Sequence, residues 1–294
     1  MNVLMRNTIS RALSATPLIA AWLAATPFVA FSANADPGGG MAARMSLETS
    51  AEAGDPFAAF VAGRRHLIAA GNSGNAEDRR IGLGFIAQAA DAGFAPAARF
   101  AGSLYLNGEL VERDVNAAIT WFTRAAKLGD TAAQHDLGDL YAEGDLVPQD
   151  LTLAALWYET ALANPEADYT MNRLYEVAYE LGALYADGLG IGADPVKARA
   201  LWQEAADKAG YPPAIKALAK AYSDGIGGPV DRGKALDTYL DAATAFRAAG
   251  IHFRIGPDAA RREVADILDR VRLLEAGSHL VKRIEKEMEE IAIP

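Results

Sequence analysis

The sequence contains no cysteine and only four histidines. Without cysteine the chain cannot form disulfides, thiolate metal sites or a lipobox-type lipid anchor. The histidines, His66, His135, His252 and His279, lie in separate elements, and we find no carboxylate or histidine at ligand spacing from any of them. The motifs H-E-x-x-H, S-x-x-K and G-x-S-x-G are also missing. We therefore predict that the protein is not an enzyme and has no catalytic residue, metal site or cofactor.

Positive charge is scarce as well. The chain has 28 lysines and arginines against 38 acidic residues, a formal net charge of −10 at pH 7. A surface this acidic repels phosphate backbones, and no basic stripe reverses that repulsion. We expect no nucleic-acid partner.

Long apolar runs are confined to the N-terminus. Residues 1–35 combine Arg6 and Arg11, an apolar stretch interrupted by two prolines, and the small-x-small sequence Ala33-Asn34-Ala35. This order is typical of a secretory signal peptide cleaved after Ala35. The alternative is a transmembrane anchor, for which the stretch is about long enough. We predict a periplasmic or secreted protein without stable membrane insertion after cleavage.

The remaining chain is dominated by an internal repeat. Aligned without gaps on four tyrosines, the units share a glycine or alanine three residues before the tyrosine and a glycine three after it. They also share an aspartate at +9, alanines at +13 and +20, and an aromatic residue at +17. The tyrosines are Tyr105, Tyr141, Tyr185 and Tyr222. The aspartates are Asp114, Asp150, Asp194 and Asp231, and the aromatic residues are Phe122, Tyr158, Trp202 and Tyr239. The anchor spacings of 36, 44 and 37 residues are typical of helical-pair solenoids.

Each column has a physical role in a helix–loop–helix unit. Apolar residues before the tyrosine recur at helical spacing. The following glycine suits a left-handed C-terminal position, and the aspartate can cap the next helix. Small residues beside the aromatic ring allow close helix packing. One unit cannot bury its apolar face alone, so we expect an all-α, right-handed superhelical solenoid of stacked antiparallel helix pairs with a concave surface.

The unit anchored by Tyr141 reads Leu137-Gly138-Asp139-Leu140-Tyr141-Ala142-Glu143-Gly144, followed by Asp150 and Ala154-Ala155-Leu156-Trp157-Tyr158. This pattern resembles the Sel1-like repeats, a subfamily of the tetratricopeptide class. The resemblance implies a protein–protein interaction scaffold whose first helices line a partner-binding groove. It also makes an exported bacterial member plausible, because exported Sel1-like proteins include negative regulators of sensor kinases for exopolysaccharide.

The pattern divides the chain further. Residues 36–93 are expected to form a linker and a degenerate N-terminal capping repeat with a long loop at Gly71–Glu77. Residues 94–250 hold the four Sel1-like repeats, and residues 251–294 hold C-terminal helices. An insertion near residues 164–178 precedes an unusually long expected helix, Met171–Leu184. At the C-terminus we expect Asp258 to cap a helix that Gly277 ends, and a cap of the solenoid is favoured over a docking helix.

Three motif-like features have both functional and architectural interpretations. Gly188-Leu189-Gly190-Ile191-Gly192 could be a phosphate loop, but it lies where every repeat turns. The aspartates could bind calcium or act in acid–base chemistry, but they recur one per repeat at helix starts. The aromatic column could stack on carbohydrate, but it keeps the spacing of the small residues beside it. We favour architecture in all three cases.

Two columns vary while their neighbours stay the same, six and two residues before each tyrosine. We name these positions the first-helix lining and predict that a partner binds there. The candidate residues are Arg99, Ser103, His135, Asp139, Tyr179, Lys216 and Lys220. Our leading hypothesis is a periplasmic adaptor for an envelope protein or peptide, regulating a membrane sensor or an envelope or exopolysaccharide process. The alternatives are an enzyme acting on peptidoglycan or a β-lactam, and a structural envelope assembly protein.

Overall fold

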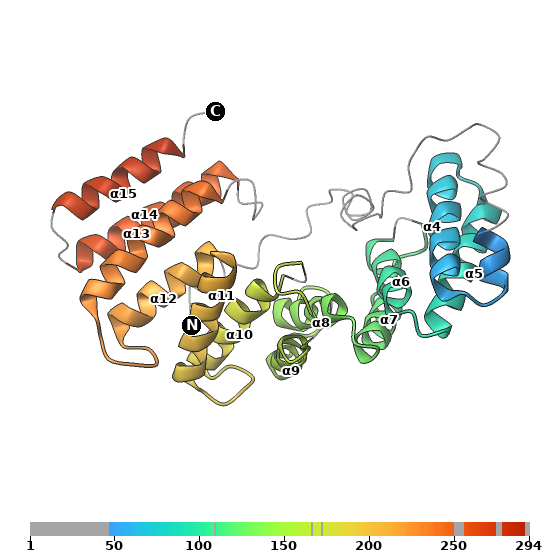
Figure 1. Ribbon diagram of the computed structural model, residues 1–294, viewed down its shortest axis with the longest axis horizontal. Helices are drawn as coiled ribbons and strands as arrows, with labels where there is room; N and C mark the ends of the chain where they lie inside the picture. Colours follow the sequence, from blue (N-terminus) through green and yellow to red (C-terminus); the bar gives the residue numbers. More distant parts are fainter. Residues whose placement is uncertain are drawn as a thin grey trace. The chain divides into compact units, whose positions relative to one another are not determined.

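A computed structural model describes residues 47–108, 110–165, 167–171, 173–249, 256–274 and 278–291. Within these ranges every regular element is an α-helix (Figure 1). The expected signal sequence, residues 1–35, and Gly277 lie outside the described residues. The chain divides at Asp114 into two compact units, between the two helices of the first repeat.

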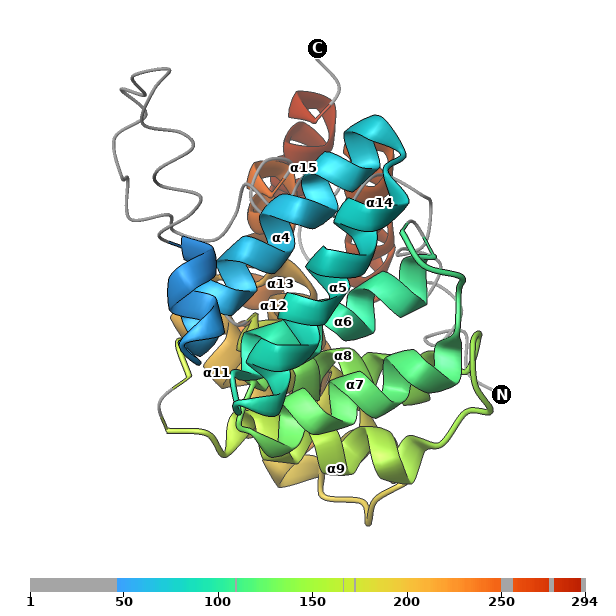
Figure 2. The same ribbon diagram turned by 90° about the vertical axis from the view of Figure 1, so that its right-hand side faces the viewer.

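The first unit contains α4 (Pro56–Ser73), α5 (Ala76–Asp91) and α6 (Ala95–Asn107). Helices α4 and α5 pack along each other as a hairpin (Figure 2). They approach so closely that a Cβ on Gly63 would lie 2.8 Å from the Gly82 carbonyl oxygen. The expected long loop at Gly71–Glu77 is wrong, because α4 continues to Ser73 and a left-handed Gly74 turns the chain directly into α5.

The second unit is a stack of helix pairs followed by a C-terminal hairpin. The repeat helices are α7 (Val115–Lys127), α8 (Thr131–Glu143), α9 (Leu151–Leu162), α10 (Leu174–Asp187), α11 (Pro195–Ala209), α12 (Pro212–Asp224) and α13 (Arg232–Ala248). Within a pair, α8 packs on α9, α10 on α11, and α12 on α13. Neighbouring pairs are joined where α7 packs on α8, α9 on α10, and α11 on α12. The predicted all-α solenoid of stacked pairs is confirmed.

The turns inside the repeats follow one local design. Gly108, Gly144, Gly188 and Gly225 end the first helices, all with left-handed backbone. The N–H of each aspartate then donates to the carbonyl of its own anchor tyrosine, at 2.8–3.0 Å in all four repeats. Side chains of Asp150, Asp194 and Asp231 also accept bonds from N–H groups in the first turns of α9, α11 and α13. The capping interpretation is confirmed at these three positions.

The aromatic column is core. Phe122, Tyr158, Trp202 and Tyr239 are at most 5% exposed. The glycine column makes their space, because a Cβ on Gly138 would lie 2.3 Å from the Tyr158 ring, and one on Gly182 would lie 2.5 Å from Trp202 Nε1. These rings are therefore inaccessible as a carbohydrate platform, and the architectural interpretation is confirmed.

Residues 167–171 of the insertion form turns, and residues 174–178 already belong to α10. The N–H groups of Thr170 and Met171 donate to the Asp168 carboxylate, at 2.9 and 2.7 Å. Arg173, with a left-handed φ of 55°, then precedes α10. The expected long helix Met171–Leu184 is wrong, since α10 starts at Leu174 and has 14 residues, against 13 in α8 and α12.

The C-terminal hairpin consists of α14 (Pro257–Leu273) and α15 (Ser278–Glu290), which pack on each other and on α13. Val264, Ile267, Val271 and Ile284 are completely buried in their shared core. The expected Asp258 cap is wrong. Gly256 is the cap residue, Pro257 takes the first helical position, and Asp258 falls inside the first turn.

Candidate partner-binding surface

The structure distributes the first-helix lining over both units. Arg99 and Ser103 lie on α6 in the first unit, where the Ser103 hydroxyl donates to the Arg99 carbonyl at 3.2 Å. His135 and Asp139 lie on α8, Tyr179 on α10, and Lys216 and Lys220 on α12, all in the second unit. Several of these side chains are occupied by contacts within the chain.

His135 and Asp139 form an ion pair one helical turn apart, with Nε2 3.3 Å from the carboxylate. Asp139 follows His135 by four residues, so the expectation that no histidine has a carboxylate at ligand spacing is wrong for His135. The Tyr158 hydroxyl from α9 donates to the same carboxylate at 2.8 Å. His135 is only 4% exposed, so this lining position is largely internal.

The charges of this cluster shift in a consistent way. Burial lowers the pKa of His135, but Asp139 and then Asp136 outweigh it and raise that pKa to about 9. Burial raises the pKa of Asp139, but His135, the Tyr158 hydroxyl and Arg173 bring it below its ordinary value. The cluster therefore holds a protonated histidine against an ionised aspartate at neutral pH.

Two glutamates beside this pair were missed by the sequence analysis. Burial raises the pKa of Glu180 on α10 to about 8, assisted by Asp139 and Glu176. Burial, Asp139 and Asp145 raise the pKa of Glu143 on α8 to about 7. Neither carboxylate has a hydrogen-bond donor or ion-pair partner in the part of the chain that the structure describes. Glu143 follows Asp139 by four residues, and this spacing could have identified it from the sequence. Glu180 lies on a different helix, so only the tertiary structure brings it within electrostatic range of Asp139.

The lysines of α12 are paired within the chain. Lys216 contacts Glu263 at 2.7 Å and Asp266 at 2.6 Å, both on α14. Burial lowers the pKa of Lys216, but the two carboxylates together outweigh burial and hold that pKa above its ordinary value. Lys220 pairs with Asp224 at 3.2 Å on its own helix. The basic end of the lining is therefore neutralised, and Lys216 helps to attach the C-terminal hairpin.

Tyrosines continue the surface beyond α10. The rings of Tyr179 and Tyr211 lie edge to face with centroids 5.8 Å apart, and those of Tyr175 and Tyr211 are 5.0 Å apart. Tyr179 and Tyr211 are partly exposed, and the Tyr179 carbonyl accepts the Trp202 indole N–H at 3.1 Å. The buried Trp202 ring of α11 thus holds the α10 backbone at Tyr179 in place.

The glycine-rich loop at residues 188–192 serves packing. A Cβ on Gly190 would lie 2.2 Å from the Leu151 carbonyl carbon, so the loop rests on the first turn of α9. The loop follows α10 rather than a strand. Its interpretation as a repeat turn is confirmed.

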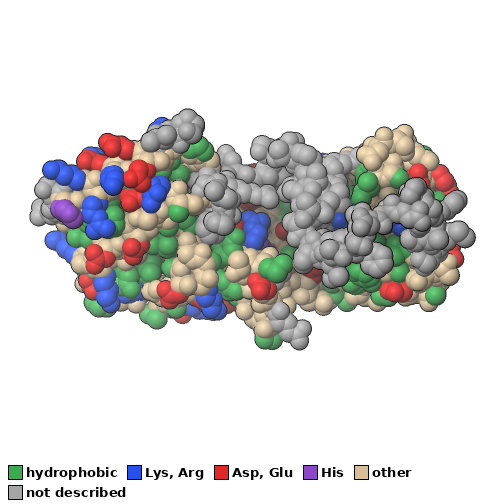
Figure 3. Space-filling model, turned by 45° about the horizontal axis from the view of Figure 1, so that its top comes forward, with side chains coloured by type: hydrophobic (Ala, Val, Ile, Leu, Met, Phe, Trp, Pro, Cys, Tyr) green, Lys and Arg blue, Asp and Glu red, His purple; other side chains and the backbone are tan. Residues whose placement is uncertain are grey.

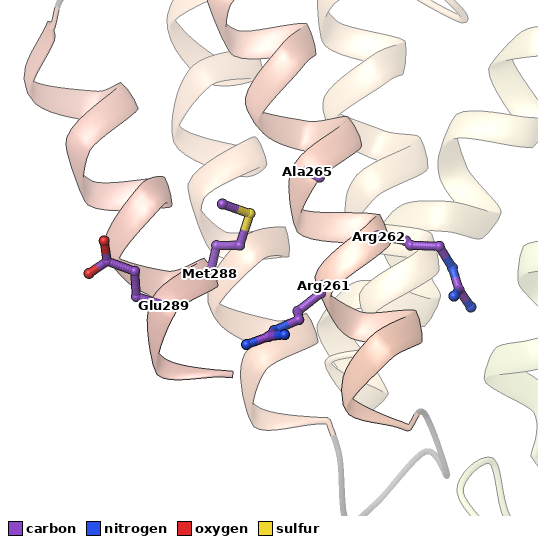
Figure 4. A pocket seen from close by; sticks show the side chains of 5 residues that line it. All are labelled: Arg261, Arg262, Ala265, Met288 and Glu289. Atoms are coloured by element: carbon purple, nitrogen blue, oxygen red, sulfur yellow. The ribbon is translucent and has the colours of Figure 1, made fainter. Parts of the chain in front are cut away.

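A shallow pocket lies between α14 and α15, lined by Arg261, Arg262, Ala265, Met288 and Glu289 (Figure 4). In Figure 4 the side chains of Arg261 and Arg262 point in different directions and do not converge. Basic and acidic side chains are interspersed over the α13–α15 region (Figure 3). The pocket therefore has the chemistry of a mixed solvated surface.

These features define an all-α helical-repeat scaffold with a polar first-helix face. The Sel1 repeat model matches residues 95–130, 131–164, 176–209 and 212–237. This part of the chain therefore consists of four Sel1 repeats, and such repeats imply a scaffold for protein–protein interaction. The family is typically non-catalytic.

Two solved structures share the architecture. A Sel1 repeat protein from Oxalobacter formigenes is 26% identical with a TM-score of 0.54, over 81% of this chain and 89% of that chain. A protective antigen of uropathogenic Escherichia coli strains, which displays an SLR fold, is 22% identical with a TM-score of 0.57. That match covers 85% of this chain but 56% of the antigen, so the chain spans little more than half of its length.

No curated protein matches the sequence significantly. Among the described helices, none combines the length and apolar character needed to cross a membrane.

Proposed function

We propose that the protein is a periplasmic scaffold that binds a segment of another envelope protein on its first-helix lining. In this role it regulates a membrane sensor or an envelope or exopolysaccharide process. The observation that carries the proposal is that constant and variable positions of the repeats have different roles. Glycine, aspartate and aromatic columns make caps and core, which leaves the variable first-helix positions for recognition. The sequence of residues 1–35 supports export.

Affinity capture from envelope extracts tests the scaffold role. Wild-type bait is expected to recover a defined envelope protein, and Lys220→Glu, which reverses a lining charge and breaks the pair with Asp224, is expected to change the amount recovered. Lys282→Glu on the exposed side of α15 makes the same charge change away from the lining and serves as the control. Recovery of nothing above background by the wild type would contradict the proposal.

Two further measurements address location and chemistry. Protein recovered from the periplasm should begin at Asp36 on N-terminal sequencing, whereas an uncleaved N-terminus in the membrane fraction would contradict export by a signal peptide. Turnover of a chromogenic β-lactam or of peptidoglycan fragments, lost on substitution of a lining residue, would replace the scaffold with an enzyme. A defined oligomer in light scattering without any partner would favour the structural assembly protein.

A further inference from the structure

The C-terminal hairpin places two carboxylates on a lysine of the first-helix lining. Lys216 Nζ on α12 lies 2.7 Å from a Glu263 carboxylate oxygen and 2.6 Å from an Asp266 carboxylate oxygen, both on α14. Glu263 and Asp266 are three residues apart and therefore lie on one face of their helix. The side chain of Lys216 is 24% exposed. The lysine thus holds an internal pair of acidic ligands and is still reached by solvent.

Helix α14 repeats the apolar spacing of a first helix. The core positions with this spacing are Ala214, Leu218, Ala221 and Tyr222 in α12, and Ala260, Val264, Ile267 and Leu268 in α14. In this register Asp266 takes the place that Lys220 takes in α12, two residues before the anchor position. Asp266 therefore belongs to the continuation of the first-helix lining on α14.

The hairpin is attached to the repeats by contacts that do not involve Lys216. Ile267 and Ile284 are completely buried in the core that α14 and α15 share with α13. Arg247 on α13 also pairs with Glu287 and Glu290 on α15. Because burial of apolar surface is the main stabilising contribution, loss of the Lys216 ion pairs should leave the hairpin in place.

The ion pairs of Lys216 are open to exchange. The side chains of Glu263 and Asp266 are 36% and 56% exposed, so water weakens their attraction to the lysine. A ligand that offers carboxylates at the same place would replace one set of charge-assisted hydrogen bonds by an equivalent set. The internal carboxylates therefore compete with an acidic ligand for Lys216.

We propose that Glu263 and Asp266 form an autoinhibitory contact, which occupies Lys216 until an acidic segment of the partner protein replaces them. This inference rests on the proposed scaffold function and adds its regulation. The occupant is a segment with two carboxylates three residues apart, because Lys216 already holds carboxylates in that arrangement.

Fluorescence anisotropy of a labelled decapeptide tests this competition. The probe is amidated and carries two glutamates three residues apart, and glutamines replace them in the matched peptide. The salt concentration is about 0.15 M, where attraction is screened beyond about 8 Å. Purified Glu263→Gln/Asp266→Asn protein should bind the glutamate peptide about three- to tenfold more tightly than the wild type. Its affinity for the glutamine peptide should equal that of the wild type.

Two control variants separate the release of Lys216 from a change in net charge. Asp237→Asn/Asp241→Asn removes two charges from exposed positions of α13 and should leave the affinity at the wild-type value. Addition of Lys216→Gln to Glu263→Gln/Asp266→Asn should abolish the gain, because the lysine that receives the peptide is then absent. Circular dichroism melts should show that every variant is folded, since the apolar core of the hairpin is unchanged.

A gain in affinity that requires both Lys216 and the glutamates of the peptide would support the inference. An equal gain in the α13 variant would show an effect of net charge alone, and a gain that persists with Lys216→Gln would place the peptide elsewhere; either result refutes the inference. Unchanged or undetectable binding by Glu263→Gln/Asp266→Asn, or its failure to fold, would refute it as well. The scaffold function would stand in each case, because envelope capture by the wild type tests it separately.

Discussion

Replacing Gly182 by alanine tests the pairing of glycine and aromatic columns that builds each repeat. In α10 the added Cβ would lie 2.5 Å from Trp202 Nε1 and 2.8 Å from Cδ1. Trp202 is 5% exposed, and its indole N–H donates to the Tyr179 carbonyl at 3.1 Å. The ring has to move, and a move endangers that hydrogen bond.

The magnitude follows from three opposing contributions. Overpacking a core destabilises by about 1–3 kcal/mol. Loss of the buried indole hydrogen bond adds about 1–3 kcal/mol if it is complete. The higher helix propensity of alanine offsets about 0.5–1 kcal/mol. We expect Gly182→Ala to lower the free energy of unfolding by about 1–4 kcal/mol, equivalent to a Tm decrease of roughly 3–12 °C.

Circular dichroism melts and urea titrations would measure this loss. Gly233→Ala in α13 is the control, because its added Cβ would meet only Asp231 Oδ1, at an ordinary 3.6 Å. The last repeat naturally pairs Ala219 with Tyr239, both buried. In a Trp202→Tyr background, Gly182→Ala should therefore cost at least about 1 kcal/mol less than in the wild type. Wild-type stability of the single Gly182→Ala variant would refute the argument.

Three other expectations use the same melts. Asp194→Ala should lower the free energy of unfolding by about 1 kcal/mol, because the Asp194 carboxylate accepts the Lys197 N–H at 2.9 Å. The control, Asp207→Ala in the last turn of α11, should change the free energy of unfolding little, and equal effects would contradict the capping role. Gly190→Ala combines a positive φ with a backbone clash and should cost more than about 2 kcal/mol, while Gly192→Ala in open space should stay within about 0.5 kcal/mol. For pH, the folded-state pKa of Glu180 is raised to about 8, so its contribution is present below about 4.5 and lost as pH rises through 8. Glu180→Gln should therefore raise Tm relative to wild type above pH 8 and have little effect at pH 4, and a pH-independent difference would refute the shift.

Much of the architecture could be predicted because its causes are local or repeat along the chain. The turn at Gly144 depends on a left-handed glycine and on Asp150 nine residues after Tyr141, all within one unit. The core position of Trp202 could be predicted from the small residues that keep the same spacing in every repeat. The insertion was harder, because Asp168 bonds its following N–H groups in turns that compete with helix at Met171.

The candidate surface depended more strongly on tertiary structure. Lys216 appears as a basic lining residue in the sequence, yet it pairs with Glu263, which is 47 residues away. The pKa of Glu180 is raised because tertiary packing buries its carboxylate and brings it within electrostatic range of Asp139 on α8. No periodicity specifies such distances between separate helices.

The sequence by itself therefore determined the repeat, its caps and its core columns, since short-range hydrogen bonds and helical spacing decide those. Only the tertiary structure decided which lining charges are already paired and which are not. Electrostatic interaction depends on distance and burial in three dimensions, and both are set when the helix pairs stack and α14 packs on α13.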